Sequence, residues 1–165
     1  MSIKYELTDE AKNINGITLH RIRALRDIPS AGVKSGDFGG WIEKESNLCQ
    51  NDNAWVYGNA KVCGNAKVCG TAEVCGNAKV CGNADYMTFK NSWSSGRWFT
   101  YTRSNKMWKV GCFYGSGEEL IKKAYADSEL SGKCYEAIVR TQEAIEAAKA
   151  EAALAKAAGE SEVKE

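Results

Sequence analysis

The middle of the chain alternates small, polar and aliphatic residues with a period of six. From Ala54 the sequence reads AWVYGN, AKVCGN, AKVCGT, AEVCGN and AKVCGN, and the series ends with ADYMTF. Ala and Val are two positions apart in each repeat, so on a strand both face the interior and the residue between them faces solvent. Gly and Asn then suit a corner that needs positive φ. This period predicts a solenoid of stacked six-residue rungs over residues 54–86.

The repeat is similar to that of a known family when each rung is read from its valine as V-C-G-N-A-K. Left-handed β-helix proteins repeat an aliphatic residue, then Gly, Ala or an acid, two variable residues, a small residue and another variable one. The resemblance implies a left-handed parallel β-helix with three rungs per coil. Lys61 would then lie beside Lys79, and Cys63 beside Cys81, at the strand spacing of about 4.8 Å.

The segments on either side of the repeat carry strand signals. Ile3–Leu7 and Ile17–Leu25 are rich in alternating apolar residues, and Asn15-Gly16 is a strong turn signal between them. After the repeat, Trp98–Arg103 and Lys106–Gly111 predict a β-hairpin.

The C-terminal part predicts two helices. The sequence SGEE from Ser116 is a capping box, so a helix is expected to start there and to run to about Tyr125. Gly132 is expected to break the chain, and residues 133–158 are Ala-rich and helical. The last seven residues, GESEVKE, are polar and predict a disordered tail.

Together these signals predict a mainly β fold: a short left-handed parallel β-helix with an N-terminal β segment, a β-hairpin and two C-terminal helices. The expected segments are 1–35, the N-terminal β segment; 36–89, the β-helix, with its regular rungs at 54–86; 90–132, the hairpin and short helix that cap it; and 133–165, the Ala-rich helix and disordered tail.

Charge is unevenly distributed although the net charge is only +1. The segment 86–112 has five Lys or Arg, no acid and seven aromatic residues. Such a mixture suits binding of nucleic acid, a nucleotide or a protein partner; the alternative is that the aromatics cap the solenoid. The rungs are too uniform to specify a partner, so we expect the irregular parts to do so. The candidate partner-binding residues are Arg97, Trp98, Arg103, Lys106, Trp108 and Lys109, with a second basic edge at Arg21, Arg23 and Arg26.

Catalysis and metal binding have little support in the sequence. Hexapeptide-repeat acyltransferases use a His as general base, but His20 is the only histidine and lies well before the repeat. Zinc enzymes of this type need three His. Successive repeat cysteines would lie on different corners, so they read as small apolar residues. We therefore expect no catalytic residue, no metal and no cofactor.

The location of the protein is expected to be the cytoplasm. No stretch approaches the roughly 18 apolar residues of a membrane span, and the N-terminus lacks the apolar region of a signal peptide. The seven cysteines are then expected to be thiols. A solenoid this short has a poor ratio of core to surface, so a homo-oligomer is predicted.

The order of motifs over residues 17–125 resembles proteins encoded by phages and prophages. The matching parts are RIRAL from Arg21, GDFGGWIE from Gly36, the GNAKV rungs, and GCFYGSGEEL from Gly111. The resemblance implies a non-enzymatic phage accessory protein that binds and inhibits or modulates a host factor, such as an anti-defence (anti-CRISPR-like) inhibitor. Its partner would be a host protein or nucleoprotein complex, with nucleic acid as a further candidate. The alternatives are a hexapeptide-type acyltransferase and a structural assembly module.

Overall fold

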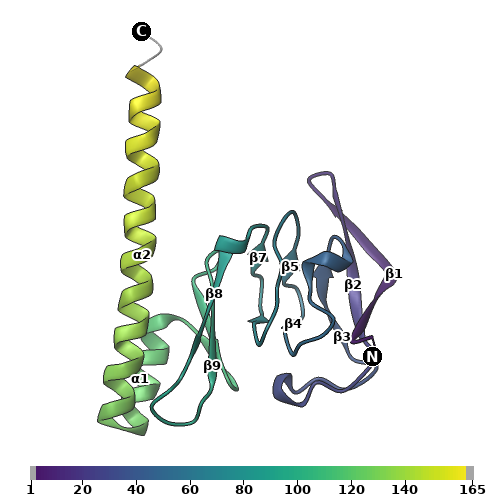
Figure 1. Cartoon of the computed structure of the whole chain (residues 1–165), viewed down its shortest axis with the longest axis horizontal. Helices are drawn as coiled ribbons and strands as arrows, with labels where there is room; N and C mark the ends of the chain where they lie inside the picture. Colours follow the sequence, from purple (N-terminus) through teal and green to yellow (C-terminus); the bar gives the residue numbers. More distant parts are fainter. Residues whose placement is uncertain (1–2, 163–165) are drawn as a thin grey trace. The chain divides into compact units, whose positions relative to one another are not determined.

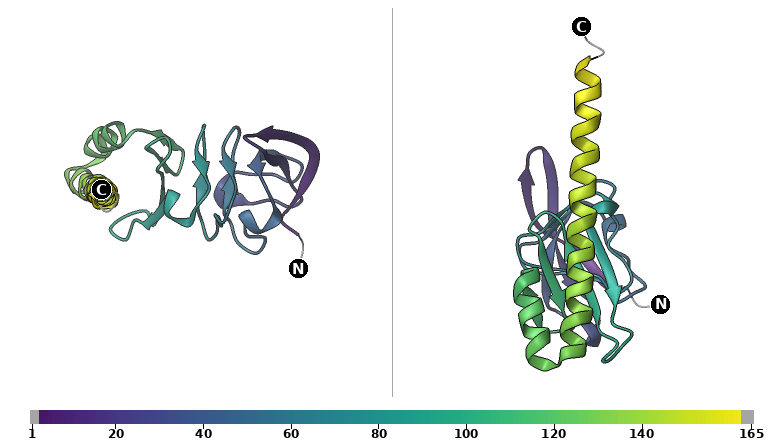
Figure 2. Two further views of the ribbon diagram at one scale, coloured as in Figure 1. Left: turned by 90° about the horizontal axis from the view of Figure 1, so that it is seen from above. Right: turned by 90° about the vertical axis from the view of Figure 1, so that its left-hand side faces the viewer.

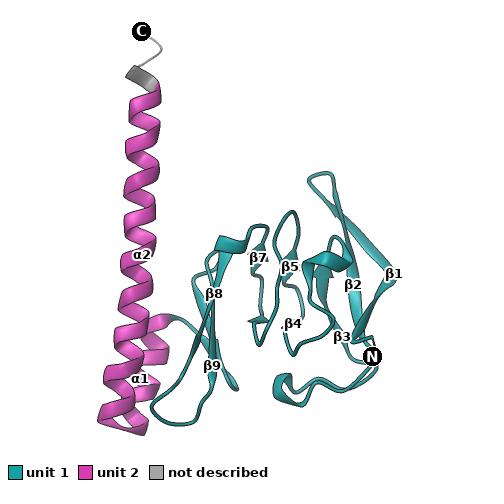
Figure 3. Ribbon diagram, in the orientation of Figure 1, with its two compact units in different colours: residues 1–116 teal, residues 117–165 magenta. Residues whose placement is uncertain are grey.

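The computed structural model describes residues 3–162, and side chains as far as residue 160. The chain folds into two compact units, Met1–Ser116 and Gly117–Glu165 (Figure 3). The described strands lie in the first unit and the two described α-helices lie in the second. All candidate binding residues therefore belong to the first unit.

The first unit begins with a mixed five-stranded sheet of order β1-β2-β3-β5-β7 (Figure 1). Pairing is antiparallel from β1 to β3 and parallel from β3 to β7. The predicted turn at Asn15-Gly16 joins β1 to β2, and both of its residues have positive φ. The strands are β1 (Tyr5–Ile14), β2 (Ile17–Ala24), β3 (Phe38–Ile42), β5 (Lys61–Val62) and β7 (Lys79–Val80).

Two further sheets complete the first unit. The strands of this unit lie side by side in two views (Figures 1 and 2). Strands β4 and β6 pair in parallel, and four antiparallel strands have the order β11-β10-β9-β8. The predicted hairpin is confirmed as β9 and β10. Its outer partners β8 and β11 were not predicted, β8 because Tyr86 was assigned to the last rung. The strands are β4 (Trp55–Val56), β6 (Glu73–Val74), β8 (Tyr86–Lys90), β9 (Trp98–Thr102), β10 (Met107–Val110) and β11 (Phe113–Gly115), and the short 3-10 turns are η1 (Pro29–Ala31), η2 (Glu45–Asn47) and η3 (Asn83–Asp85).

The prediction of a left-handed parallel β-helix as the fold class is wrong. Strands of the repeat are only two residues long, and they are divided between the mixed sheet and the two-stranded sheet. Val68 makes only an isolated parallel bridge to Leu48. A period of six decides which side chains face inward, but the backbone groups available nearby decide which sheet a strand joins. The antiparallel strands β1, β2 and β3 supply a sheet edge with such backbone groups, and β5 pairs with it. The fold therefore consists of mixed and antiparallel sheets plus two helices.

The inward positions of the repeat form the main hydrophobic core, as the period predicted. Lys61 is paired with Lys79 and Trp55 with Glu73. Residues 18 positions apart, or three repeats, therefore lie opposite each other on neighbouring strands, as expected. Five alanines of the repeat, Ala54, Ala60, Ala66, Ala72 and Ala78, are buried together with its valines, whereas Ala84 of the last rung is exposed. The five valines of the repeat are fully buried: Val56, Val62, Val68, Val74 and Val80.

Two glycines allow β3 to lie against this core. A Cβ atom on Gly39 would lie 2.7 Å from the carbonyl oxygen of Val56, and one on Gly40 would lie 2.7 Å from that of Ala60. Backbone atoms cannot rotate away from such an approach, so no larger residue fits without moving a strand. The next residue, Trp41, packs in a separate cluster on the other face of the sheet. The two glycines of the GDFGGWIE segment therefore allow the close packing of β3 against the repeat.

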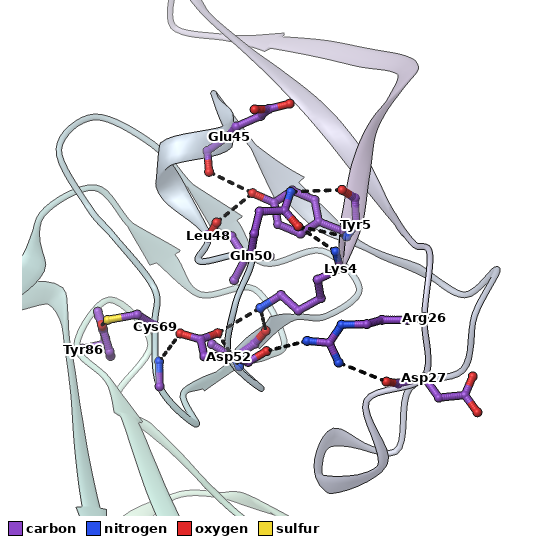
Figure 4. A network of polar contacts seen from close by, with 12 residues as sticks. Lys4, Tyr5, Arg26, Asp27, Glu45, Leu48, Gln50, Asp52, Cys69 and Tyr86 are labelled. Carbon is purple, nitrogen blue, oxygen red and sulfur yellow. Dashed lines mark hydrogen bonds and ion pairs between the residues drawn. The ribbon is translucent and has the colours of Figure 1, made fainter. Parts of the chain in front are cut away.

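A polar network joins the start of the chain to residues 45–54 (Figure 4). The side chain of Lys4 is fully buried and donates to the Asp52 carboxylate at 3.0 Å and to the Ala54 carbonyl at 2.7 Å. Desolvation lowers the pKa of Lys4, and the hydrogen bond and charge of Asp52 oppose that shift. The side-chain oxygen of Gln50 accepts the backbone N–H groups of Lys4 and Tyr5. This network attaches strand β1 to the rest of the unit.

The second unit consists of α1 (Gly117–Asp127) and α2 (Glu129–Glu162). The predicted start of α1 is confirmed, but the predicted break at Gly132 is wrong because this residue lies inside α2. A Cβ atom there would lie 2.2 Å from the ring of Tyr125, so the glycine lets the two helices approach. Helix α2 continues to Glu162, where a disordered tail was predicted; residues 163–165 of that tail lie outside the described residues. No helix of the described chain is both long and apolar enough to cross a membrane.

Candidate binding surface

A row of basic side chains crosses the outer face of the five-stranded sheet. Arg21 on β2 is paired with Trp41 on β3, Trp41 with Lys61 on β5, and Lys61 with Lys79 on β7. Neighbouring strands are about 4.8 Å apart, so these positions follow one another at that spacing. The backbone N–H of Lys79 then donates to the Ser104 hydroxyl at 2.7 Å. This contact brings Arg103, the residue before Ser104, to the end of the row. The basic row is defined as Lys12, Arg21, Lys61, Lys79 and Arg103.

Trp41 supports the beginning of the basic row. The Lys12 ammonium lies 3.7 Å from the centre of the Trp41 ring, and the Arg21 guanidinium carbon lies 5.9 Å from it. The negative face of an indole attracts such cations. Burial, and then the charges of Lys61 and Arg21, lower the pKa of Lys12, whereas Glu10 opposes the shift. The cations are therefore close enough to repel one another.

The far end of the basic row opens into a hollow of about 380 Å³. Lys79 and Arg103 line it, together with Cys81, Asp85 and Ser104. The Asp85 carboxylate accepts the backbone N–H of Cys81 at 2.9 Å and that of the following glycine at 2.8 Å. An acidic group of a partner could enter the hollow between the two cations.

Acidic residues beside the basic row are already engaged. Glu10 lies 3.2 Å from the guanidinium of Arg21. The Glu43 carboxylate accepts the backbone N–H of Gly64 at 2.6 Å. The surface therefore has an excess of positive charge with acids interspersed.

A disulfide between Cys63 and Cys81 lies immediately beyond Lys61 and Lys79. The Cα atoms of the two cysteines are 4.5 Å apart, as expected for residues opposite each other on neighbouring strands. The sequence favoured thiols here, on the assumption of a reducing compartment. The bond ties β5 to β7 and fixes the register that places the two lysines side by side.

Two residues of the predicted Arg edge have other roles in this structure. Arg23 forms an ion pair with Glu6 across the β1–β2 hairpin. Arg26 donates to the backbone carbonyls of Asp27 and Asp52, both at 3.3 Å, and so joins the network around Lys4 (Figure 4). Arg21 is the member of this predicted edge that belongs to the basic row.

The predicted anchor Trp108 lies in the interior. It is 2% exposed, and its ring centre lies 6.3 Å from that of Phe99 and 5.0 Å from that of Tyr101. Trp108 therefore packs within the fold and is not an exposed anchor for a partner. Lys106 is exposed in the β9–β10 turn, where it has a positive φ of 54°.

Arg97, Trp98 and Lys109 are associated with a second hollow, of about 290 Å³. Arg97 and Trp98 line it, as does Glu73. Lys109 Nζ lies 3.5 Å from the Glu73 carboxylate, so its charge is used within the fold. The sequence candidates in segment 86–112 are thus divided among the basic row, this hollow, the exposed turn and the interior.

Sequence reasoning missed Lys12, Lys61 and Lys79 as binding residues. The signal for two of them was present, because three rungs per coil, which the resemblance to left-handed β-helix repeats implies, place Lys61 beside Lys79. The position of Lys12 over Trp41 depends on the β1–β2 hairpin, and no local pattern shows it.

No known family or curated relative identifies this surface: no family model matches the chain, and the search of curated proteins found no match. His20 lies on β2 with its Nδ1 atom 3.4 Å from the carbonyl oxygen of Thr8. Among the described residues, no three His, Cys, Asp or Glu side chains gather where they could hold a metal ion.

Proposed function

We propose that the protein is a non-enzymatic binding protein whose basic row contacts an acidic surface on a protein of the bacterial host. The alignment of Lys61 beside Lys79, with Arg21 in the same row, is the observation that carries this proposal. The resemblance of residues 17–125 to phage and prophage proteins supports a phage accessory role. In that role, the bound host factor is inhibited or modulated, as by an anti-defence inhibitor.

Folding stability does not explain the alignment of like charges. Two lysines directly opposite each other on neighbouring strands cost roughly a few tenths of a kcal/mol. An acidic partner would remove this repulsion and would be attracted before contact, which speeds encounter at low salt. The row therefore favours a binding role over a purely structural one.

The interspersed acids favour a protein over a nucleic acid as the partner. Nucleic-acid interfaces are strongly positive because every phosphate is negative. Here Glu10 and Glu43 lie beside the basic row, where their negative charge would repel a phosphate chain. A protein with mixed, mainly acidic charge matches this pattern better.

The substitution Lys79→Glu tests the proposal. It places opposite charges side by side at Lys61, so the melting temperature should stay the same or rise slightly. The host protein would be captured from nuclease-treated lysate, identified by mass spectrometry and purified. We expect its Kd to increase about tenfold, which corresponds to 1.4 kcal/mol, and the loss to shrink at high salt.

The matched control is Lys67→Glu, which reverses an exposed lysine of the repeat outside the basic row. We expect this control to leave the Kd unchanged. Equal Kd values for the two variants would refute the basic row as the contact surface. Captured material that disappears on nuclease treatment would instead identify nucleic acid as the partner and contradict the proposal.

We also propose that the protein is a homo-oligomer in which α2 supplies a contact. Ile145 is 39% and Leu154 is 72% exposed, and residues 151–160 are all exposed. Ile138, Ile145 and Ala152 are spaced by seven, as in a helical seam. Deleting residues 133–165 should lower the mass of the assembly in light scattering, and a monomeric mass for the full chain would contradict this.

A further inference from the structure

The second hollow has the features of a small-ligand site, and none of them belongs to the basic row. Its volume is about 290 Å³, near the lower end for small-molecule pockets. Segments far apart in the sequence line it, so it depends on the tertiary fold. Its lining includes Asn53, Thr71, Glu73, Arg97, Trp98 and Gly111.

Glu73 supplies a carboxylate that is held in place. One of its oxygens lies 3.3 Å from the Tyr57 hydroxyl and 3.5 Å from Lys109 Nζ. Its backbone N–H donates to the Thr100 hydroxyl at 3.0 Å. The side chain is 18% exposed, and desolvation raises its pKa, with Lys109 opposing the shift. The other oxygen has no hydrogen-bond partner within the part of the chain that the structure describes, so it can accept a hydrogen bond from a ligand.

Arg97 supplies a cation at the same hollow. It is exposed, and its side chain lies across Gly111, where an added Cβ atom would be 3.4 Å from Arg97 Cδ. Its guanidinium makes no ion pair or hydrogen bond among the described residues. An unengaged guanidinium favours an anion with planar or bidentate acceptors, such as a phosphate.

Trp98 supplies an aromatic face. It is 41% exposed, far more than Trp108 on the neighbouring strand, which is 2% exposed. Lys90 Nζ lies 5.9 Å from its ring centre and adds positive charge there. An exposed indole can stack on any nucleobase.

We propose that this hollow binds a cytosine nucleotide, whose base carries an exocyclic amino group. The base would stack on Trp98, its amino group would donate to Glu73, and its phosphate would contact Arg97. Carboxylates accept the amino group of cytosine in protein–DNA complexes, which is the chemistry required here. The site is independent of the basic row, so either proposal can fail without the other.

Isothermal titration of the full chain with CMP, UMP and cytidine tests this inference. We expect CMP to bind and cytidine to bind at least tenfold more weakly, because cytidine lacks the phosphate. UMP should also be at least tenfold weaker, because it presents a carbonyl where cytosine presents an amino group. Absence of binding by CMP at millimolar concentration, or equal affinity for all three, would overturn the proposal.

Three variants assign the contacts. Arg97→Gln should reduce CMP affinity to that of cytidine, Glu73→Gln should remove the preference for CMP over UMP, and Trp98→Leu should weaken all three ligands. Lys106→Gln is the control, because it removes an exposed cation of the β9–β10 turn that does not line the hollow. Tighter binding of glucuronic acid than of CMP would overturn the nucleotide in favour of an acidic sugar. Loss of CMP binding in the control would place the site elsewhere.

Discussion

Lys4 donates a 3.0 Å hydrogen bond to the Asp52 carboxylate. The side chain of Lys4 is fully buried, and that of Asp52 is 21% exposed. The pair therefore holds a cation in the interior at the point where the start of the chain meets the repeat. Asp52 also accepts the backbone N–H groups of Ala54 and Gly70. The ion pair and these backbone contacts make Asp52 a junction between strand β1 and two successive turns.

Removing Asp52 should therefore destabilise the protein more than removing Lys4. Asp52→Ala leaves the buried ammonium with the Ala54 carbonyl alone and should cost about 3 kcal/mol. Lys4→Met removes the buried charge together with its pair and should cost less. Chemical denaturation of the two variants measures the difference, and an equal or reversed order would contradict this account.

The Lys4–Asp52 pair also predicts a pH dependence. Burial lowers the pKa of Lys4 in the folded state. Between this lowered pKa and the ordinary lysine pKa of about 10.4, the unfolded chain therefore binds more protons than the folded one. The free energy of unfolding contributed by this group should therefore rise with pH through that window, and below it should not change. Lys4→Met should abolish this rise. A parent and a Lys4→Met variant with identical alkaline profiles would show that Lys4 does not titrate this way.

Val68→Asp should disrupt the core of the repeat. Val68 is fully buried and bridges to Leu48, so a carboxylate there would be unpaired and should cost several kcal/mol, about 3 or more. The control Lys67→Asp changes the adjacent exposed residue and should cost less than about 0.5 kcal/mol. Thermal melting of both variants distinguishes them. A Val68→Asp protein that melts like the parent would be incompatible with the parallel arrangement of the repeat.

Gly40→Ala should destabilise the first unit by about 2 kcal/mol or more, because its methyl group would meet the Ala60 carbonyl oxygen at 2.7 Å. Gly159→Ala is a suitable control: no atom lies within 4 Å of a Cβ atom there, and alanine is the better helix former. The melting temperatures provide the comparison. Tolerance of alanine at Gly40 would mean that β3 does not lie as close to the core as described.

The Cys63–Cys81 bond predicts five free thiols in the oxidised protein, since the chain has seven cysteines. Alkylation under denaturing, non-reducing conditions followed by mass spectrometry counts them. Reduction should lower the free energy of unfolding by about 3 kcal/mol, the value typical for a loop of this size. Seven labelled thiols before any reductant is added would show that the bond is absent in the isolated protein.

Much of the local structure followed from the sequence. The alternation of Ala and Val in the repeat predicted which side chains are buried, and Asn15-Gly16 and SGEE predicted a turn and a helix start. These signals are local, because side-chain direction, φ preference and capping depend on residues a few positions apart. Even the pairing of Lys61 with Lys79 was expected, because the resemblance to left-handed β-helix repeats implies three rungs per coil.

Only the tertiary structure decided which sheet each strand joins and where the candidate residues meet. Arg21 and Arg103 lie near the two ends of one row, whereas Arg26 joins an internal network and Trp108 lies in the core. Glu73 and Trp98 line one hollow although different sheets supply them. A local pattern distinguishes inward from outward positions. It does not show whether an outward residue stays in solvent or is covered by a distant segment. That outcome depends on strand pairing and packing between segments far apart in the chain, and in this protein the antiparallel strands on both sides of the repeat decided it.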